Sequence, residues 1–379
     1  MLFFSPPHKG EQKRLARSNT RQHEGKRVGR QVNEQAHALW YVGPHRAEIR
    51  DETVAAEVGP GEVRIEALYG GISRGTERLV FSGRVPASEY ACMRAPFMAG
   101  DFPFPVKYGY ATVGRIMAGP DALIGRIAFA LHPHQTVFTL PADRVALLPA
   151  DVPASRGVLA ANMETAVNAL WDAAPGPADR IAVVGAGVVG SLCAWLAGKL
   201  PGAEVTLVDI DKSRAAIAAA LGVRFALPDT APGERDLVIH ASASQAGLAT
   251  ALQLAGNEAT VVELSWYGAG EIAVSLGEAF HSRRLRLISS QVGQVAPSHR
   301  PRWSHARRME AALALLADPA LDAVIAPAVD FHDLPAQLPK ILDGPGGVLC
   351  QLIRYPAATT PAFFDIQTAS LPDVNPAGS

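Results

Sequence analysis

The sequence predicts an α/β protein with a β-rich, barrel-like domain first and a doubly wound parallel sheet of the Rossmann type second. Three observations support this fold class. At 379 residues, the chain exceeds the ~100–200 residues of one ordinary domain. Short apolar runs bounded by Gly and Pro occupy the stretch from Ala38 to Gly119. After Pro153, strand-like and helix-like segments alternate, as they do in βαβ units.

The first half contains short segments in which apolar and polar residues alternate, a pattern that favours half-buried strands over helices. The predicted strands are residues 38–42, 63–68, 110–116, 126–130 and 135–140. Pro103, Pro105 and their aromatic neighbours predict an irregular loop within this half. The regular spacing of strands and glycines indicates a barrel-like β domain.

The second half begins with a helix predicted over 155–172, which ends before the breaker run at 175–177. The segments that follow alternate between the two types. Strands are predicted at 180–184, 204–208, 237–240, 259–264 and 285–289, and helices at 188–199, 212–220 and 246–254. A further helix over 307–317 and a β segment around 348–354 complete the pattern. The Pro- and Ala-rich end of the chain is expected to be loose.

Composition narrows the class of protein. Hydrophobic residues make up 48% and charged residues 19%, as in well-buried globular proteins. A formal net charge of −1 provides no bulk attraction to nucleic acid or to an anionic membrane. No apolar run approaches the ~20 residues that span a bilayer. Three scattered cysteines, Cys92, Cys193 and Cys350, favour a reducing compartment, most simply the cytoplasm.

The first 30 residues differ from the rest, because eight of them are Lys or Arg and only Glu11 and Glu24 oppose that charge. A secretory signal needs an apolar stretch behind its basic start, which is absent here. We interpret residues 1–35 as a disordered tail or the product of an upstream start codon. An Arg-rich organellar presequence is the alternative.

The sharpest motif is the Gly-Ala-Gly-Val-Val-Gly run at 185–190, which follows an apolar strand and opens an apolar helix. In G-x-G-x-x-G, the first glycine makes a tight turn, the second lets backbone approach a pyrophosphate, and the third packs helix on sheet. Asp209 follows the next strand, 24 residues after Gly185, where a carboxylate binds the adenosine ribose. The motif therefore predicts NAD(H) rather than NADP(H), although Lys212 and Arg214 lie nearby. A glycine-rich turn with an unrelated aspartate is the alternative.

With the β-rich half first, the chain resembles the medium-chain dehydrogenase/reductase superfamily from about Ala38 to Tyr355. The motifs that carry the resemblance are residues 70–77, 108–114, 185–190, 236–242 and 262–266. The resemblance implies a GroES-like substrate domain at 36–165 with 295–358, a Rossmann domain at 166–294, and a C-terminal tail at 359–379. It also implies a homodimer. The stretch from Ser73 to Glu77 is similar to the bacteriochlorophyllide dehydrogenase branch.

The departures from the superfamily concern zinc. Zinc members carry a cysteine where this chain has Ser73, and a Gly-His-Glu where it has Tyr110 and Ala111. Hydroxyl groups are poor zinc ligands beside thiolate and imidazole. Glu164 matches a third ligand position, but one carboxylate makes no site. Three cysteines also cannot supply the four-cysteine structural zinc site, so we expect no metal.

The resemblance places Ser73, Tyr110 and Glu164 around the position that zinc occupies in relatives. We expect Tyr110 or Ser73 to donate a hydrogen bond to the substrate oxygen, with Glu164 as proton acceptor or orienting group. The alternative is that these side chains only fill the space of the metal. Another alternative is a zinc site built from Glu164 with His132 or His134.

The expected cofactor contacts combine the fingerprint with positions matched to the superfamily. A guanidinium at Arg74 suits a pyrophosphate. The full set is Arg74, Thr165, Gly185, Gly187, Val188, Val189, Asp209, Ala241, Ser242, Ser265 and Ser290. The strand ends that carry Trp266, Tyr267 and Gln291 are also expected near the nicotinamide. A cluster of His281, Arg283 and Arg284 could bind an anionic substrate, but a solvated helix end explains it better.

These observations predict a zinc-independent, NAD(H)-dependent oxidoreductase that acts on an alcohol or carbonyl, or on an activated alkene. Its only expected partner besides a second copy is a small-molecule substrate, and neither nucleic acid nor a membrane is expected. An NAD(H)-binding sensor that has lost catalysis is the first alternative. A zinc-dependent dehydrogenase with atypical ligands is the second.

Overall fold

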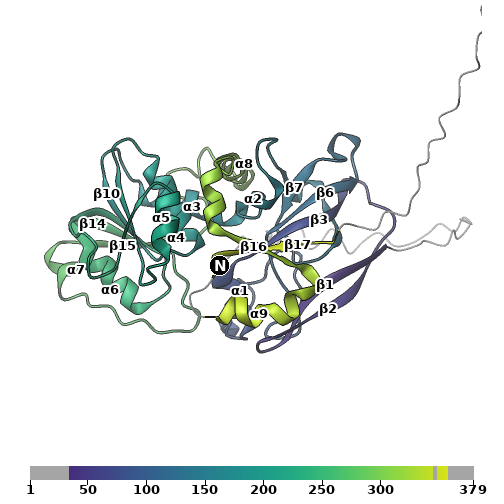
Figure 1. Cartoon of the computed structure of the whole chain (residues 1–379), viewed down its shortest axis with the longest axis horizontal. Helices are drawn as coiled ribbons and strands as arrows, with labels where there is room; N and C mark the ends of the chain where they lie inside the picture. The colour runs from purple at the N-terminus through teal and green to yellow at the C-terminus, as the bar shows by residue number, and fades with distance from the viewer. Residues whose placement is uncertain (1–33, 345–347, 357–379) are drawn as a thin grey trace, which may run out of the picture.

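A computed structural model describes residues 34–344 and 348–356 (Figure 1). The strands between Arg180 and Ser289 form one lobe with the helices Arg214–Ala220, Gln245–Leu254 and Ala279–Ser282, and the remaining strands form the other lobe. The helices Ala160–Ala173 and His305–Leu315 lie between the two lobes. The tails predicted at 1–35 and 359–379 fall almost entirely outside the described residues. Both lobes confirm the predicted fold class.

One lobe is built on a six-stranded parallel sheet in the order β12-β11-β10-β13-β14-β15. Its strands are β10 (Arg180–Val184), β11 (Glu204–Val208), β12 (Arg224–Ala226), β13 (Arg235–His240), β14 (Ala255–Glu263) and β15 (Arg286–Ser289). The helices are α4 (Val188–Gly198), α5 (Arg214–Ala220), α6 (Gln245–Leu254) and α7 (Ala279–Ser282). This strand order is that of a Rossmann sheet.

The sequence of β10 shows why a parallel sheet forms here. Ile181 and Val183 pack into one buried cluster, whereas Ala182 and Val184 pack into a second cluster. Successive side chains of a strand point to opposite faces, so β10 is apolar on both faces. A strand of this kind needs helices on both sides of its sheet, which α4–α6 supply.

The other lobe contains two sheets. The larger has the order β16-β17-β3-β6-β7-β9, with β8 also paired to β3, and the smaller has the order β2-β1-β5-β4. The early strands are β1 (Glu34–Gly43), β2 (Arg46–Val54), β3 (Glu62–Ile72), β4 (Ala99–Gly100), β5 (Val106–Lys107), β6 (Thr112–Ala118), β7 (Ile127–Ala130), β8 (Val137–Pro141) and β9 (Val145–Leu147). From the end of the chain, β16 (Ile325–Asp330) and β17 (Cys350–Arg354) join them.

The remaining elements connect and cover these sheets. The helices are α1 (Arg74–Phe81), α2 (Ala154–Gly157), α3 (Ala160–Ala173), α8 (His305–Leu315) and α9 (Leu334–Asp343). Short 3-10 helices are η1 (Ala87–Glu89), η2 (Asp121–Leu123), η3 (Ala142–Arg144), η4 (Pro319–Val324) and η5 (Phe331–Asp333). The helix predicted over 155–172 is two helices, α2 and α3. No helix in the described part of the chain has the length and apolar character needed to cross a membrane.

Candidate functional site

The turn between β10 and α4 has the geometry that the three glycines predict. Gly185 has a φ of +107°, which favours glycine, and a Cβ there would lie 2.6 Å from the backbone nitrogen of Ser242. A Cβ on Gly190 would lie 1.9 Å from the carbonyl oxygen of Gly185. By contrast, a Cβ on Gly187 would meet no atom within 4 Å. Open space therefore lies over Gly187, at the N-terminus of α4, where a phosphate fits.

Asp209 lies directly beside this turn, at the end of β11. Its carboxylate accepts hydrogen bonds from the backbone N–H of Ala186 (2.6 Å) and of Asp211 (2.9 Å). Arg214 is 3.4 Å from the Asp211 carboxylate. The carboxylate predicted to bind the ribose is thus fixed next to the predicted phosphate site.

Arg74 begins α1 and reaches the end of α9. Its guanidinium donates to the carbonyl oxygens of Leu342 (3.2 Å) and Gly344 (2.7 Å). Partial burial lowers the pKa of Arg74, and the positive charges of Arg78 and Arg214 lower it further.

Ser73 and Tyr110, two of the predicted catalytic residues, come together in the first lobe. Ser73 directly precedes α1, and Tyr110 is buried just before β6. Burial raises the pKa of the Tyr110 phenol, and the charge of Glu77 raises it further. Hydrogen bonds with the Ser73 and Thr76 side chains act in the opposite direction. The phenol is therefore protonated at neutral pH and can donate a hydrogen bond.

Glu77 is a central member of this cluster that sequence reasoning did not select. Its fully buried carboxylate accepts hydrogen bonds from the Tyr41 hydroxyl (2.8 Å), from the Ser73 N–H (2.9 Å) and from His134 Nε2 (3.0 Å). The spacing of Ser73 and Glu77, one turn apart at the start of a helix, is the only sequence signal for it. We call Ser73, Glu77, Tyr110 and His134 the α1 cluster.

Glu164 is held in a different way. Its carboxylate accepts from Arg308 Nε at 3.0 Å, and both side chains are buried. Arg308 also donates to Asn168 Oδ1 and to the carbonyl oxygens of Val292 and Gln294. Burial raises the pKa of Glu164, while the charge and hydrogen bond of Arg308 lower it. Arg308, on α8, had not been predicted as part of the site.

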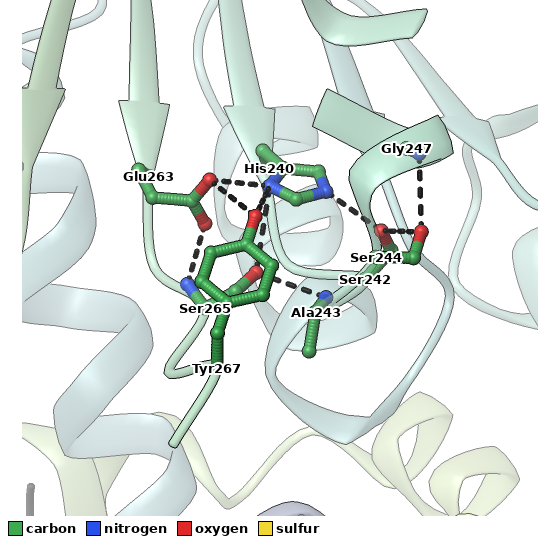
Figure 2. Close-up of polar contacts among 8 residues, drawn as sticks. All are labelled: His240, Ser242, Ala243, Ser244, Gly247, Glu263, Ser265 and Tyr267. Atoms are coloured by element: carbon green, nitrogen blue, oxygen red, sulfur yellow. Dashed lines mark hydrogen bonds and ion pairs between the residues drawn. The ribbon is translucent and has the colours of Figure 1, made fainter. Parts of the chain in front are cut away.

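A third polar group lies where β13 and β14 end (Figure 2). His240 is buried, with Nδ1 2.7 Å from Glu263 Oε2 and Nε2 2.6 Å from the Ser242 hydroxyl. The Tyr267 hydroxyl donates to the same carboxylate oxygen at 2.9 Å, and the Ser265 N–H donates to the other at 2.7 Å. Ser242 and Ser265 were predicted cofactor contacts, whereas His240 and Glu263 were not selected.

The remaining predicted residues are also placed by the structure. Thr165 bonds the Ala161 carbonyl (2.9 Å), and Ser290 bonds the Asp172 carboxylate (2.6 Å). Ala241, Val188 and Val189 are half-buried beside the glycine turn. Arg283 and Arg284 pair with glutamates at the opposite end of the sheet from the turn, as a solvated helix end would.

The residues around the α1 cluster do not fit a zinc ion. Within 34–344 and 348–356, no three His, Cys, Asp or Glu side chains converge into a metal-binding group. The pKa of Tyr110 is raised, and Glu164 is occupied by Arg308. His132 stacks on Phe138 with ring centres 3.7 Å apart, and burial lowers its pKa to about 3. The atypical zinc site with His132 or His134 therefore has no geometry to support it among these residues.

Comparison with known proteins gives fold-level matches. No protein-family model matches the sequence, and no curated protein matches it significantly. L-idonate 5-dehydrogenase of Escherichia coli K-12 aligns with a TM-score of 0.69 at 13% identity, over 85% of this chain and 99% of that chain. The RspB alcohol dehydrogenase of E. coli CFT073, solved with NADH, gives 0.67 at 16% identity, over 84% and 99%. S. aureus TarJ, solved with NADPH, gives 0.66 at 14%, over 86% and 100%.

The fold is that of the medium-chain dehydrogenases. Near-complete coverage of these structures confirms the predicted fold, in which a GroES-like domain is combined with a Rossmann domain. At identities of 13–16%, the likeness establishes the medium-chain dehydrogenase fold alone. Because one of these structures holds NADH and another NADPH, the fold does not determine which nucleotide this chain prefers.

Proposed function

We propose that this protein is an NAD(H)-dependent oxidoreductase that transfers hydride without zinc to or from an alcohol, a carbonyl or an activated alkene. The observation that carries the proposal is the turn at 185–190. The space over Gly187, at the N-terminus of α4, is open, and the Asp209 carboxylate lies beside the turn. This is the donor arrangement that a dinucleotide requires.

Each part of the dinucleotide would be bound by different residues of the chain. The N–H groups at the start of α4 bind the pyrophosphate, Arg74 adds positive charge, and Asp209 accepts hydrogen bonds from the adenosine ribose. When bound, the nicotinamide supplies or accepts the hydride. A carboxylate at Asp209 repels a 2′-phosphate, which favours NAD(H).

The α1 cluster provides the proton chemistry in this proposal. Tyr110 or Ser73 donates a hydrogen bond to the substrate oxygen, which becomes more basic as hydride arrives. Burial, reinforced by the charge of the Glu77 carboxylate, raises the pKa of Tyr110 and keeps its phenol protonated at neutral pH. Glu164 keeps an orienting role, because its ion pair with Arg308 fixes it on α3.

Replacing Asp209 by asparagine is expected to weaken NADH binding about tenfold and to reduce the preference for NADH over NADPH, because a charged ribose acceptor becomes neutral. Fluorescence titration of purified protein with both nucleotides measures this, with zinc content determined on the same sample. Asp211→Asn is the matched control, two residues away. If wild-type protein binds neither nucleotide, the proposed function is wrong, and stoichiometric zinc would overturn the zinc-free mechanism.

Replacing Tyr110 by phenylalanine is expected to lower turnover about 100-fold with little change in NADH affinity, since it removes one proton donor. The measurement is NADH oxidation with a panel of aldehydes, ketones and enones. Tyr108→Phe is the matched control, because Tyr108 is also buried but its hydroxyl donates to the Met93 carbonyl (3.2 Å). Wild-type turnover in both variants would exclude Tyr110 as the donor.

An NAD(H) sensor is the second candidate, and the burial of Tyr110, which is only 2% exposed, favours it. A sensor binds NADH tightly but turns over none of the panel. The homodimer and the cytoplasmic location, both predicted from the sequence, are compatible with either function. Light scattering checks the first, since a dimer has about twice the 40.0 kDa mass of one chain.

A further inference from the structure

The Glu263–His240 pair lies next to the glycine turn. Val184, the last residue of β10, is in register with His240, and His240 is in register with Glu263. The backbone of Ser242 packs directly against Gly185, as the 2.6 Å clearance for a Cβ shows. The ends of three neighbouring strands therefore bring together the turn, the imidazole and the carboxylate.

The strand order shows which half of a dinucleotide would lie here. Asp209 marks the adenosine side on β11, and the pyrophosphate site is at the end of β10. A dinucleotide that crosses the carboxyl ends of the strands from β11 through β10 continues over β13 and β14. The nicotinamide half therefore falls at His240 and Glu263.

A chain of hydrogen bonds connects the start of α6 to the Glu263 carboxylate through His240 (Figure 2). The Gly247 N–H donates to Ser244 Oγ, which is 2.9 Å from Ser242 Oγ. An ionised carboxylate can only accept, so His240 carries a proton on Nδ1 and donates it to Glu263 Oε2. The Tyr267 hydroxyl and the Ser265 N–H donate to the same carboxylate, so three donors stabilise its negative charge.

Burial raises the pKa of the Glu263 carboxyl, but the hydrogen bonds and charge of His240 and the hydrogen bonds of Ser265 outweigh it, so the net pKa is lowered. The Glu263 carboxyl is thus ionised at neutral pH, at the strand end where the nicotinamide half would lie. A nicotinamide ring is positively charged when oxidised and neutral when reduced.

We infer that the Glu263–His240 pair sets the relative affinity of this protein for NAD⁺ and NADH, an inference that rests on the proposed function. When His240 is neutral, the Glu263 carboxylate attracts the oxidised ring and favours NAD⁺. Protonation of His240 cancels that charge, so the preference shifts toward NADH as pH falls. The pair thereby couples proton binding to the redox state of the nucleotide.

The groups facing His240 all belong to this network. From the β14 side these are the Glu263 carboxylate, the Tyr267 hydroxyl (3.4 Å from Nδ1) and the Ser265 hydroxyl (3.4 Å). From the α6 side they are Ser242 and Gly247, whose added Cβ would lie 2.8 Å from Nε2. On β10, the neighbour in register is the aliphatic Val184.

The test is to measure Kd for NAD⁺ and for NADH from pH 6 to 8.5 by calorimetry on the full chain. Wild type, Glu263→Gln and His240→Gln are compared, with thermal melting as a check of folding. Glu258→Gln is the matched control, because Glu258 is an exposed glutamate elsewhere on β14, near Arg284 (3.4 Å). Calorimetry in two buffers of different ionisation enthalpy also counts the protons released on binding.

In the wild type, Kd(NADH)/Kd(NAD⁺) should rise with pH, and NAD⁺ should release more protons than NADH. Glu263→Gln should lower Kd(NADH)/Kd(NAD⁺) at pH 8.5 about tenfold, a change in free energy equal to that of ~1 pKa unit. The same variant should reduce the dependence of this ratio on pH. His240→Gln should keep the high ratio at every pH, and Glu258→Gln should behave as wild type. Equal weakening of both nucleotides in Glu263→Gln would overturn the inference and leave the proposed function standing. Failure of the wild type to bind either nucleotide overturns both.

Discussion

Replacing Arg308 by methionine is expected to lower the free energy of unfolding by about 3–5 kcal/mol, among the largest effects of any single substitution here. The change leaves the buried Glu164 carboxylate without its cation and removes the donor to Asn168 and to two carbonyl oxygens. A buried charge that loses its partner costs more than the pair contributed.

The measurement is urea unfolding at several pH values, with Arg307→Met as control, because Arg307 is exposed and stacks over Trp303. Without Arg308, only burial acts on Glu164, so the pKa of that carboxyl rises further. A raised carboxyl pKa in the folded state means that stability is lost as pH rises. The deficit of Arg308→Met should therefore be smaller at pH 5 than at pH 8. Equal losses in both variants would contradict the prediction.

The second large effect is expected at the glycine turn, where two neighbouring substitutions should act differently. Gly190→Ala forces a Cβ to within 1.9 Å of the Gly185 carbonyl oxygen, so it should lower the free energy of unfolding by ~1–3 kcal/mol and also weaken NADH binding. Gly187→Ala meets no protein atom within 4 Å, so the fold should keep its stability. Its methyl group occupies the space of the pyrophosphate, and NADH affinity should fall at least about tenfold.

Thermal melting and NADH titration of both variants separate the two effects. Gly187→Ala is the informative one, because it tests binding without disturbing packing. If it binds NADH as tightly as wild type, the open space over Gly187 is not the phosphate site.

Sequence patterns predicted the Rossmann sheet well, because its strands are short, apolar and separated by amphipathic helices. The predicted bounds of 180–184 and 204–208 match β10 and β11, and the helix from Val188 ends within one residue of its prediction. The glycine turn was also predictable, because its chemistry is local. Gly185 and Gly190 are required by close backbone contacts, whereas Gly187 leaves open space, as the spacing of the three glycines implies.

Other elements were missed for physical reasons. Helix α9, which was not predicted, contains Pro335 near its start and Pro339 inside it, and an internal proline is typical of a helix break rather than of a helix. Strands β2, β12 and β16 were not predicted. In β2 most side chains are exposed or half-buried, and its pairing with β1 supplies the order that its own pattern does not.

The partners within the site were the least predictable part. Glu164 and Arg308 are 144 residues apart in sequence, and His134 and Glu77 are 57 apart. Position matching identified Glu164, but nothing in its local sequence indicates that an arginine from α8 holds it. His240 and Glu263 were not predicted as site residues, because each ends an ordinary apolar strand. Their side chains form a pair only when β13 and β14 lie side by side.

The position of β17 has a consequence for the order in which the protein can fold during synthesis. This strand lies between β3 and β16 in the larger sheet, although it comes from the end of the chain. All six Rossmann strands lie between Arg180 and Ser289, so that lobe has its complete sheet before Cys350 leaves the ribosome. Until then, β3 presents an unpaired edge that could pair with other chains. The last lobe to be completed is therefore the one whose synthesis began first.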